Sequence, residues 1–221
     1  MAIYSSSIPP VHVTRQSAYS AVFSRKHDPS IIAFIDAPTG RNLSRGDLRD
    51  LTLQLAHGVR TQHGLRRGDT ALIFSPNSLA WPVLLFGLVA AGVRVSPVNN
   101  VYTPAELANQ YLDCAARLVF VHPDLLPVML DMFAHIGVKR ADARSRIVVM
   151  CLPGDDLPAA GFASMGELFG CGALPTEERF DGELADEVAY LCYSSGTTGK
   201  PKGVEVRRLR HGCPVVCTDR T

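Results

Sequence analysis

Residues 188–204 read VAYLCYSSGTTGKPKGV, and this stretch decides how the rest of the chain is interpreted. Its first six residues are apolar or aromatic, which predicts a short buried strand. The next eleven contain four hydroxyl residues, three glycines, one proline and two lysines. Glycines let backbone N–H groups approach an anion closely, while hydroxyl groups and lysines add further donors and positive charge. We therefore interpret this run as a phosphate-binding loop rather than as a flexible linker.

The loop does not follow the common G-x-x-x-x-G-K-[ST] pattern, because Ser194 stands where the first glycine belongs and Pro201 replaces the magnesium-binding hydroxyl residue. Position for position, it resembles the phosphate-loop signature of the adenylate-forming (AMP-binding) superfamily, which includes acyl- and aryl-CoA synthetases, luciferases and peptide-synthetase adenylation domains. Residues 76–78 and 97–107 are similar to the matching segments of the coumarate:CoA ligase branch. We assign no chemistry to this second block, since an N-capped helix after an Asn-rich turn is ordinary architecture.

The resemblance implies a two-step reaction. A carboxylate attacks the α-phosphate of Mg-ATP, and the thiol of coenzyme A then displaces AMP, so ATP, magnesium and coenzyme A are the implied cofactor and co-substrates. The positions that match the family's phosphate contacts are Ser194, Ser195, Gly196, Thr197, Thr198, Gly199, Lys202 and Gly203. The hydroxyl residues and Gly196 are expected to surround the β- and γ-phosphates, with Lys202 as charge partner and the other two glycines shaping the backbone. No catalytic residue and no metal ligand are identified.

The spacing of apolar residues predicts an α/β fold with a parallel sheet covered by helices on both faces. Strands are expected at 30–36, 69–75, 93–96, 118–122, 146–151 and 188–193, and helices near 17–23, at 44–62, 79–91, 103–116 and 124–136, with helical turns at 164–169. Ser44 with Asp47, and Thr103 with Glu106, have the spacing of capping boxes, which mark helix starts.

Composition excludes several classes of protein. The chain has 221 residues, of which 47% are hydrophobic and 19% charged, with a formal net charge of +1. This balance predicts one well-cored domain without general attraction to nucleic acid or to anionic membranes. The longest apolar run, 79–93, is shorter than a membrane span, and six scattered cysteines are expected to be free thiols. The N-terminus lacks a secretory pattern, so we expect a cytoplasmic protein, with a peroxisomal location open if the native C-terminus lies elsewhere.

The resemblance stops after Val206. Residues 207–221 contain four arginines and two cysteines without a helical or strand period. We therefore interpret 1–206 as a partial N-terminal AMP-binding domain that ends just after the phosphate loop, followed by an unrelated basic tail from a frameshift, retained intron or gene-model error. The strand that enters the loop is then expected to lack flanking strands. The family's later segments, including the domain with the catalytic lysine, are expected to be missing.

By family, the expected function is that of an ATP-dependent carboxylic acid:CoA ligase that is inactive as this truncated chain. The expected partners are a small carboxylic acid and a nucleotide, and the sequence does not indicate an oligomeric state. The alternative is a non-catalytic fragment that binds a nucleotide or completes the sheet of a full-length relative. Nucleic-acid binding through the arginine tail is weakly supported, because the tail lacks interleaved aromatic residues.

Overall fold

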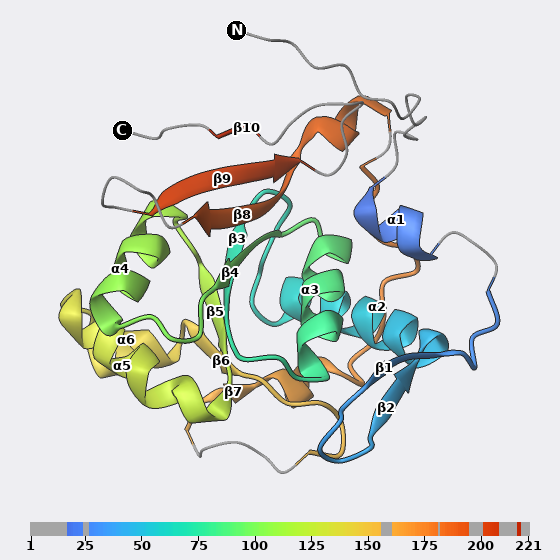
Figure 1. Ribbon diagram of the computed structural model, residues 1–221, viewed down its shortest axis with the longest axis horizontal. Helices are drawn as coiled ribbons and strands as arrows, with labels where there is room; N and C mark the ends of the chain where they lie inside the picture. The colour runs from blue at the N-terminus through green and yellow to red at the C-terminus, as the bar shows by residue number, and fades with distance from the viewer. Residues whose placement is uncertain are drawn as a thin grey trace, which may run out of the picture.

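The computed structural model describes residues 17–23, 27–155, 161–180, 182–194, 201–207 and 216–217. In this part of the chain, a mixed sheet in the order β10-β9-β8-β4-β3-β5-β6-β7 forms the centre of the molecule (Figure 1). Its strands are β3 (Thr70–Phe74), β4 (Arg94–Val98), β5 (Leu118–Val121), β6 (Ile147–Val149), β7 (Ala163–Ser164), β8 (Val188–Ser194), β9 (Lys202–Arg207) and β10 (Val216–Cys217). The strands from β8 to β7 run parallel, whereas β9 is antiparallel to both β8 and β10.

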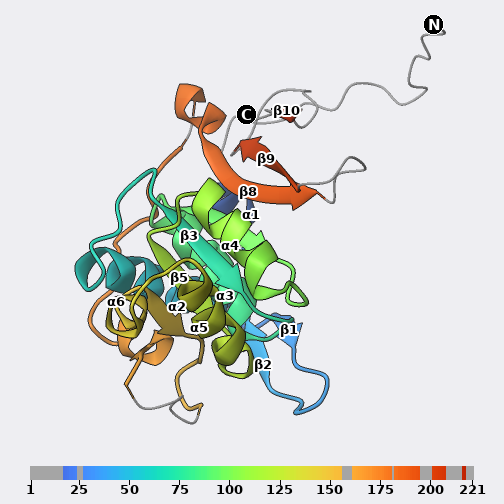
Figure 2. The ribbon, with the colours of Figure 1, turned by 90° about the vertical axis from the view of Figure 1, so that its left-hand side faces the viewer.

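A separate two-stranded sheet pairs β1 (Ile32–Ile35) with β2 (Asn42–Ser44), and it lies away from the β8–β9 hairpin (Figure 2). The α-helices are α1 (Ala18–Phe23), α2 (Arg45–Thr61), α3 (Ala80–Ala90), α4 (Pro104–Asp113), α5 (Leu126–His135) and α6 (Arg140–Arg144). Short 3-10 helices span Pro123–Leu125, Met165–Leu168 and Gly182–Asp186. Both predicted capping boxes are present, at the starts of α2 and α4.

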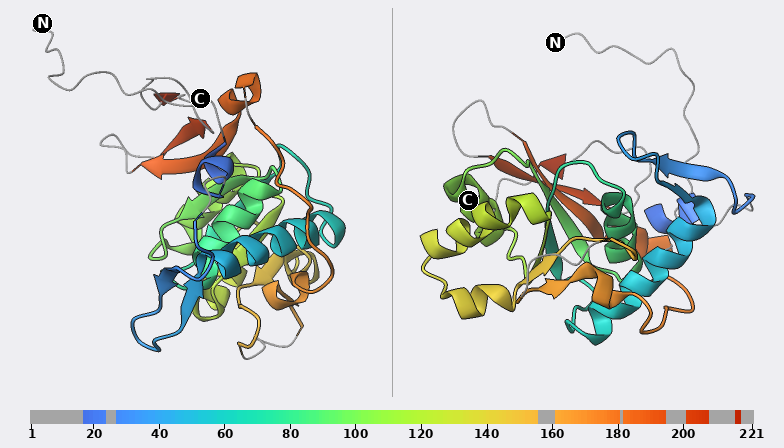
Figure 3. Two further views of the ribbon diagram at one scale, coloured as in Figure 1. Left: turned by 90° about the vertical axis from the view of Figure 1, so that its right-hand side faces the viewer. Right: turned by 90° about the horizontal axis from the view of Figure 1, so that it is seen from below.

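Helices cover both faces of the sheet, with α2 and α3 on one side and α4, α5 and α6 on the other (Figure 3). Side chains of a strand alternate between the two faces, and all five residues of β3 are buried. Ala71 and Ile73 belong to the core beneath α2 and α3, whereas Leu72 and Phe74 belong to the core beneath α4 and α5. This double burial explains the continuous apolar strand sequences.

The α/β class, the parallel strands and the main helices are confirmed. The prediction that the strand entering the loop lacks flanking strands is wrong, because β8 pairs with β4 on one side and with β9 on the other. The sequence interpretation also missed β9, the short α6 and β7. The loop run quoted above includes the first residues of β9, and Val204 and Val206 alternate with polar or small residues as they do in a strand.

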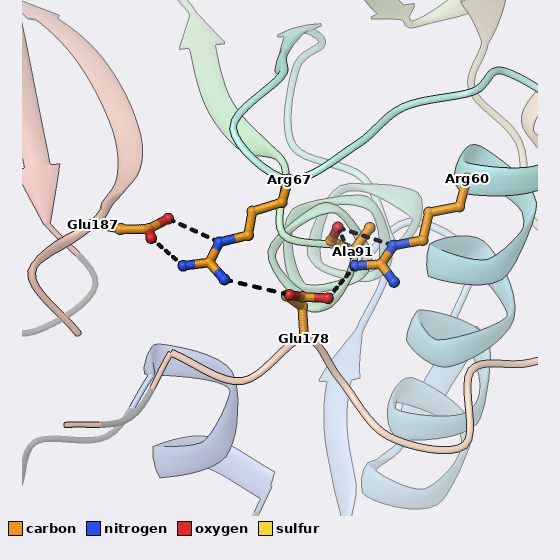
Figure 4. A network of polar contacts seen from close by, with 5 residues as sticks. All are labelled: Arg60, Arg67, Ala91, Glu178 and Glu187. Atoms are coloured by element: carbon orange, nitrogen blue, oxygen red, sulfur yellow. Dashed lines mark hydrogen bonds and ion pairs between the residues drawn. The ribbon is translucent and has the colours of Figure 1, made fainter. Parts of the chain in front are cut away.

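An ion-pair network fixes the segment that leads into β8 (Figure 4). The Glu178 carboxylate accepts a 2.6 Å hydrogen bond from Arg60 and lies 3.7 Å from the Arg67 guanidinium, which also pairs with Glu187. Arg60 donates to the carbonyl oxygen of Ala91 as well, at 2.9 Å from Nη2, and so satisfies an acceptor at the C-terminal end of α3. The network therefore ties α2, α3 and the start of β3 to the approach to β8.

Two backbones approach closely where α2 meets the 3-10 helix Met165–Leu168. A Cβ atom added at Gly58 would lie 2.5 Å from the carbonyl oxygen and 2.9 Å from the Cα of Leu168. These are backbone atoms, so they cannot move aside as a flexible side chain could. The small size of this glycine is therefore what allows the contact.

We predict that Gly58→Ala lowers the free energy of unfolding by about 1–2 kcal/mol, because overpacking outweighs the gain in helix propensity. Urea denaturation measures the change. Gly46→Ala in the same helix is the control, since its new Cβ would come no closer than 3.1 Å to another atom, the nearest being the Cβ of the exposed Pro29, with its carbonyl oxygen at 3.3 Å. Equal stabilities of Gly58→Ala and wild type would contradict the packing argument.

We also predict that Glu178→Ala lowers the free energy of unfolding by about 1–2 kcal/mol, because two half-buried guanidinium groups lose their shared partner. Glu183→Ala is the matched control, since Glu183 is exposed in the neighbouring 3-10 helix. Denaturation at low and high salt measures both variants, and the loss is expected to shrink as salt rises. An equally small effect of the two substitutions would show that the network adds nothing to stability.

Candidate phosphate-binding site

The structure describes the base of the predicted loop. Ser194 ends β8 and Lys202 begins β9, and the two residues are paired across the hairpin. Both are exposed, and Gly203 pairs with Tyr193 one step further from the loop. The remaining predicted site residues, which lie outside the described part of the chain, are Ser195, Gly196, Thr197, Thr198 and Gly199. Among the described residues, the loop end of the hairpin therefore carries the hydroxyl group of Ser194 and the ammonium group of Lys202.

The end of the β8–β9 hairpin that carries the loop lies at the carboxyl edge of the parallel strands. β8 runs parallel to β4 through the pairing of Tyr190 with Val95, and β4 runs parallel to β3. Ser194, the last residue of β8, therefore lies at the same edge of the sheet as Val98 and Phe74, the last residues of β4 and β3. In open α/β sheets, ligands bind outside the carboxyl ends of the strands. The topology therefore places Ser194 and Lys202, the described residues that flank the loop, on the side of the sheet where a ligand is expected.

A buried polar cluster attaches β8 to β4 and α4. Ser96 Oγ donates a 3.0 Å hydrogen bond to the carbonyl oxygen of Leu191 in β8. Gln110 Nε2, from α4, donates to Ser96 Oγ at 2.9 Å and to the carbonyl oxygen of Pro97 at 3.0 Å. Ser96 is fully buried and Gln110 is 3% exposed, so leaving either side chain unpaired would be costly. This cluster fixes β8 just before the loop begins.

The neighbouring Cys114 follows the last residue of α4. Burial raises the pKa of its thiol to about 11, so the group stays neutral at physiological pH. A neutral buried thiol behaves as a small apolar side chain rather than as a nucleophile. Cys114, Cys151, Cys171 and Cys192 are all free thiols, as the cysteine spacing predicted.

The described residues show neither a candidate metal centre nor a membrane-spanning helix. They contain no group of three or more histidine, cysteine, aspartate or glutamate residues that could hold a metal ion. No helix in the described ranges combines the length and the apolar character that crossing a membrane requires.

Sequence reasoning found the loop but missed the residues that support it. Ser96 and Gln110 lie in the β4–α4 block to which no chemistry was assigned, and their contacts depend on the position of β8. The available signal was a glutamine on the apolar face of α4, since Gln110 stands between the buried Leu107 and Tyr111. A long polar side chain on a buried face has to find a partner.

The chain matches known proteins over most of its length. The family model described as AMP-binding enzyme covers residues 22–210. The protein called 4-coumarate–CoA ligase-like 3 of Oryza sativa subsp. japonica is 34% identical over an alignment of 220 positions, which covers 91% of this chain and 35% of that protein. The chain spans about a third or less of the length of this and two further rice relatives.

Solved structures share the fold. A red-emitting luciferase from Phrixothrix hirtus superposes with a TM-score of 0.72 at 22% identity, covering 90% of this chain and 48% of the luciferase. ATP-bound MatB from Rhodopseudomonas palustris gives a TM-score of 0.66 at 24% identity, covering 86% of this chain and 34% of MatB. Together with the loop at the carboxyl edge of the sheet, the family match over residues 22–210 shows that this chain belongs to the AMP-binding enzyme family, within its acyl- and aryl-CoA ligase relatives.

Proposed function

We propose that this chain carries the ATP-phosphate-binding portion of an ATP-dependent carboxylic acid:CoA ligase. The observation that carries the proposal is the hairpin base, where Ser194 and Lys202 face each other at the carboxyl edge of the parallel sheet. The proposed phosphate contacts are Ser194, Ser195, Gly196, Thr197, Thr198, Gly199, Lys202 and Gly203. The ATP-bound relative of the same fold supports the choice of nucleotide.

The chemistry of the hairpin suits this role. Adenylate formation releases pyrophosphate, so negative charge increases on the β-phosphate oxygens as the reaction proceeds. Hydroxyl and backbone N–H donors stabilise such charge when they are held in place before the reaction, and the ammonium group of Lys202 adds a compact positive charge. In this proposal, Lys202 stands at the first position of a strand, so its backbone is fixed although its side chain is exposed.

The other parts of the proposal rest on the family resemblance. A small aryl or acyl carboxylic acid is the proposed substrate, with magnesium as cofactor and coenzyme A as co-substrate. We keep residues 1–206 as the partial N-terminal domain and 207–221 as an unrelated tail, although the family model extends to residue 210. A cytoplasmic location also stays a prediction. The chain spans 35% of its rice relative. The alternative proposal is therefore a non-catalytic fragment that binds a nucleotide through this same loop.

We predict that the purified chain binds Mg-ATP and that Lys202→Met weakens binding by about 10- to 100-fold, because a charge-assisted contact to phosphate is lost. Isothermal titration calorimetry measures the dissociation constants. Lys139→Met is the matched control, since Lys139 is an exposed lysine at the start of α6, distant in sequence from the hairpin. Unchanged affinity in Lys202→Met, or an equal loss in both variants, would refute the proposed phosphate contact.

We further predict that the 221-residue chain forms no acyl-CoA when supplied with Mg-ATP, coenzyme A and a panel of aryl and acyl carboxylic acids. The reason is that these 221 residues correspond to about a third of the rice relative, and the family resemblance places the catalytic lysine in the part that they do not cover. Release of pyrophosphate and mass spectrometry of thioester products measure the two half-reactions. The rice relative, of which this chain covers 35%, is assayed in parallel with the same acids. Acid-dependent pyrophosphate release by the short chain would contradict this prediction.

A further inference from the structure

The end of the β8–β9 hairpin that carries the loop is held to helix α4 by a contact between two side chains. The Tyr193 hydroxyl donates a hydrogen bond to Oδ2 of Asp113, the last residue of α4. Tyr193 is the residue immediately before the loop residue Ser194, and 80 positions of sequence separate it from Asp113. Figure 1 shows α4 beneath the end of the hairpin where β8 ends and β9 begins. The contact therefore lies directly at the base of the proposed phosphate loop.

Gly203 completes this contact from the opposite strand. It pairs with Tyr193 across the hairpin, so both residues point to the same face. A Cβ atom at Gly203 would lie 3.4 Å from Cε1 and Cζ of the Tyr193 ring, and 3.4 Å from Oδ2 of Asp113. The ring therefore lies against the glycine backbone with its hydroxyl turned to the carboxylate. A large side chain at 203 would push the ring away from Asp113.

The position of Asp113 is unfavourable by the rules of an isolated helix. A carboxylate at a helix C-terminus faces the negative end of the helix dipole, and the last turn of α4 contains no basic residue. Local preference therefore gives no reason for an aspartate here. The hydrogen bond from Tyr193 gives such a reason, because a carboxylate is a strong acceptor for a phenolic hydroxyl.

β8 needs such support near its end. Its backbone pairing with β4 consists of the single pair Val95 and Tyr190, and the Ser96 contact reaches only as far as Leu191. In the register set by that pair, Cys192 and Tyr193 lie opposite Pro97 and Val98 of β4, but no backbone pair joins them to β4, and the described pairings of Cys192, Tyr193 and Ser194 are with β9. A two-stranded ribbon is weakly held and twists readily. Fixing its direction before the ligand arrives saves the ordering cost on binding.

We propose that Asp113, acting through Tyr193, is a positioning residue that sets the direction of the phosphate loop and thereby its affinity for the triphosphate of ATP. This inference rests on the proposed function for the role of the loop. Neither residue needs to touch the nucleotide. The hydrogen bond and the packing of the ring on Gly203 hold the strand ends from which the loop starts.

The test combines two measurements on the purified 221-residue chain. Mg-ATP affinity is measured by calorimetry, and hydrogen–deuterium exchange of peptides covering 188–194 and 202–207 is measured without nucleotide. Tyr193→Phe removes the hydroxyl but keeps the ring, Asp113→Ala removes the acceptor, and Asp113→Asn keeps an acceptor oxygen. Asp131→Ala in α5 is the matched control, because Asp131 is an exposed carboxylate in the middle of a different helix.

We expect Tyr193→Phe and Asp113→Ala each to weaken Mg-ATP binding by about 3- to 10-fold, with the double variant no weaker than either single one. Exchange of the hairpin peptides should accelerate in these variants, while Asp113→Asn and Asp131→Ala stay close to wild type. Changed melting temperatures with unchanged hairpin exchange and unchanged affinity would overturn the inference.

The two proposals fail in different ways. If wild type binds no Mg-ATP, the proposed function fails, and hairpin exchange alone decides whether Asp113 anchors the strand ends. If wild type binds Mg-ATP but Tyr193→Phe and Asp113→Ala bind it equally well, the loop keeps its function and the positioning role is refuted.

Discussion

The attachment of β8 to the sheet is the constraint on which the loop depends. β3 and β4 share five backbone pairs, whereas β4 and β8 share one. Side chains strengthen this attachment. Ser96 donates a hydrogen bond to the carbonyl oxygen of Leu191 in the core, and Asp113 accepts one from Tyr193 at the edge of the sheet. Parallel strands fix the direction of a chain through repeated hydrogen bonds. In this protein, hydrogen bonds from polar side chains of β4 and α4 provide part of the attachment of β8.

The framework could be predicted because its signals are local. β3, β5 and β6 are apolar throughout, since both of their faces are buried, and the Ser44 and Thr103 capping boxes mark the starts of α2 and α4. β9 had a local signal too, in the alternation of Val204 and Val206. That signal is short, because only two apolar residues alternate before the composition changes after residue 206.

The contacts that support the loop could not be predicted in the same way. Arg60 and Glu178 are 118 positions apart, and Tyr193 and Asp113 are 80 apart. Such pairs follow from the strand order, which local patterns do not determine. The loop itself was located by a motif that needs no knowledge of the fold. The phosphate site could therefore be inferred from residue types alone, whereas the contacts that support it depend on the positions of the neighbouring helix and strand.

The strand order also has a consequence for how the chain is built during synthesis. Val95 and Tyr190 pair across 95 positions, so β4 emerges from the ribosome long before the strand that covers its edge. During that interval, β3, β5 and β6 can assemble, because each pairs with a strand close to it in the sequence. The free edge of β4 meanwhile offers unpaired N–H and C=O groups to any other extended chain. This edge is therefore where a nascent copy is most exposed to mispairing, and arrival of the β8–β9 hairpin ends that exposure.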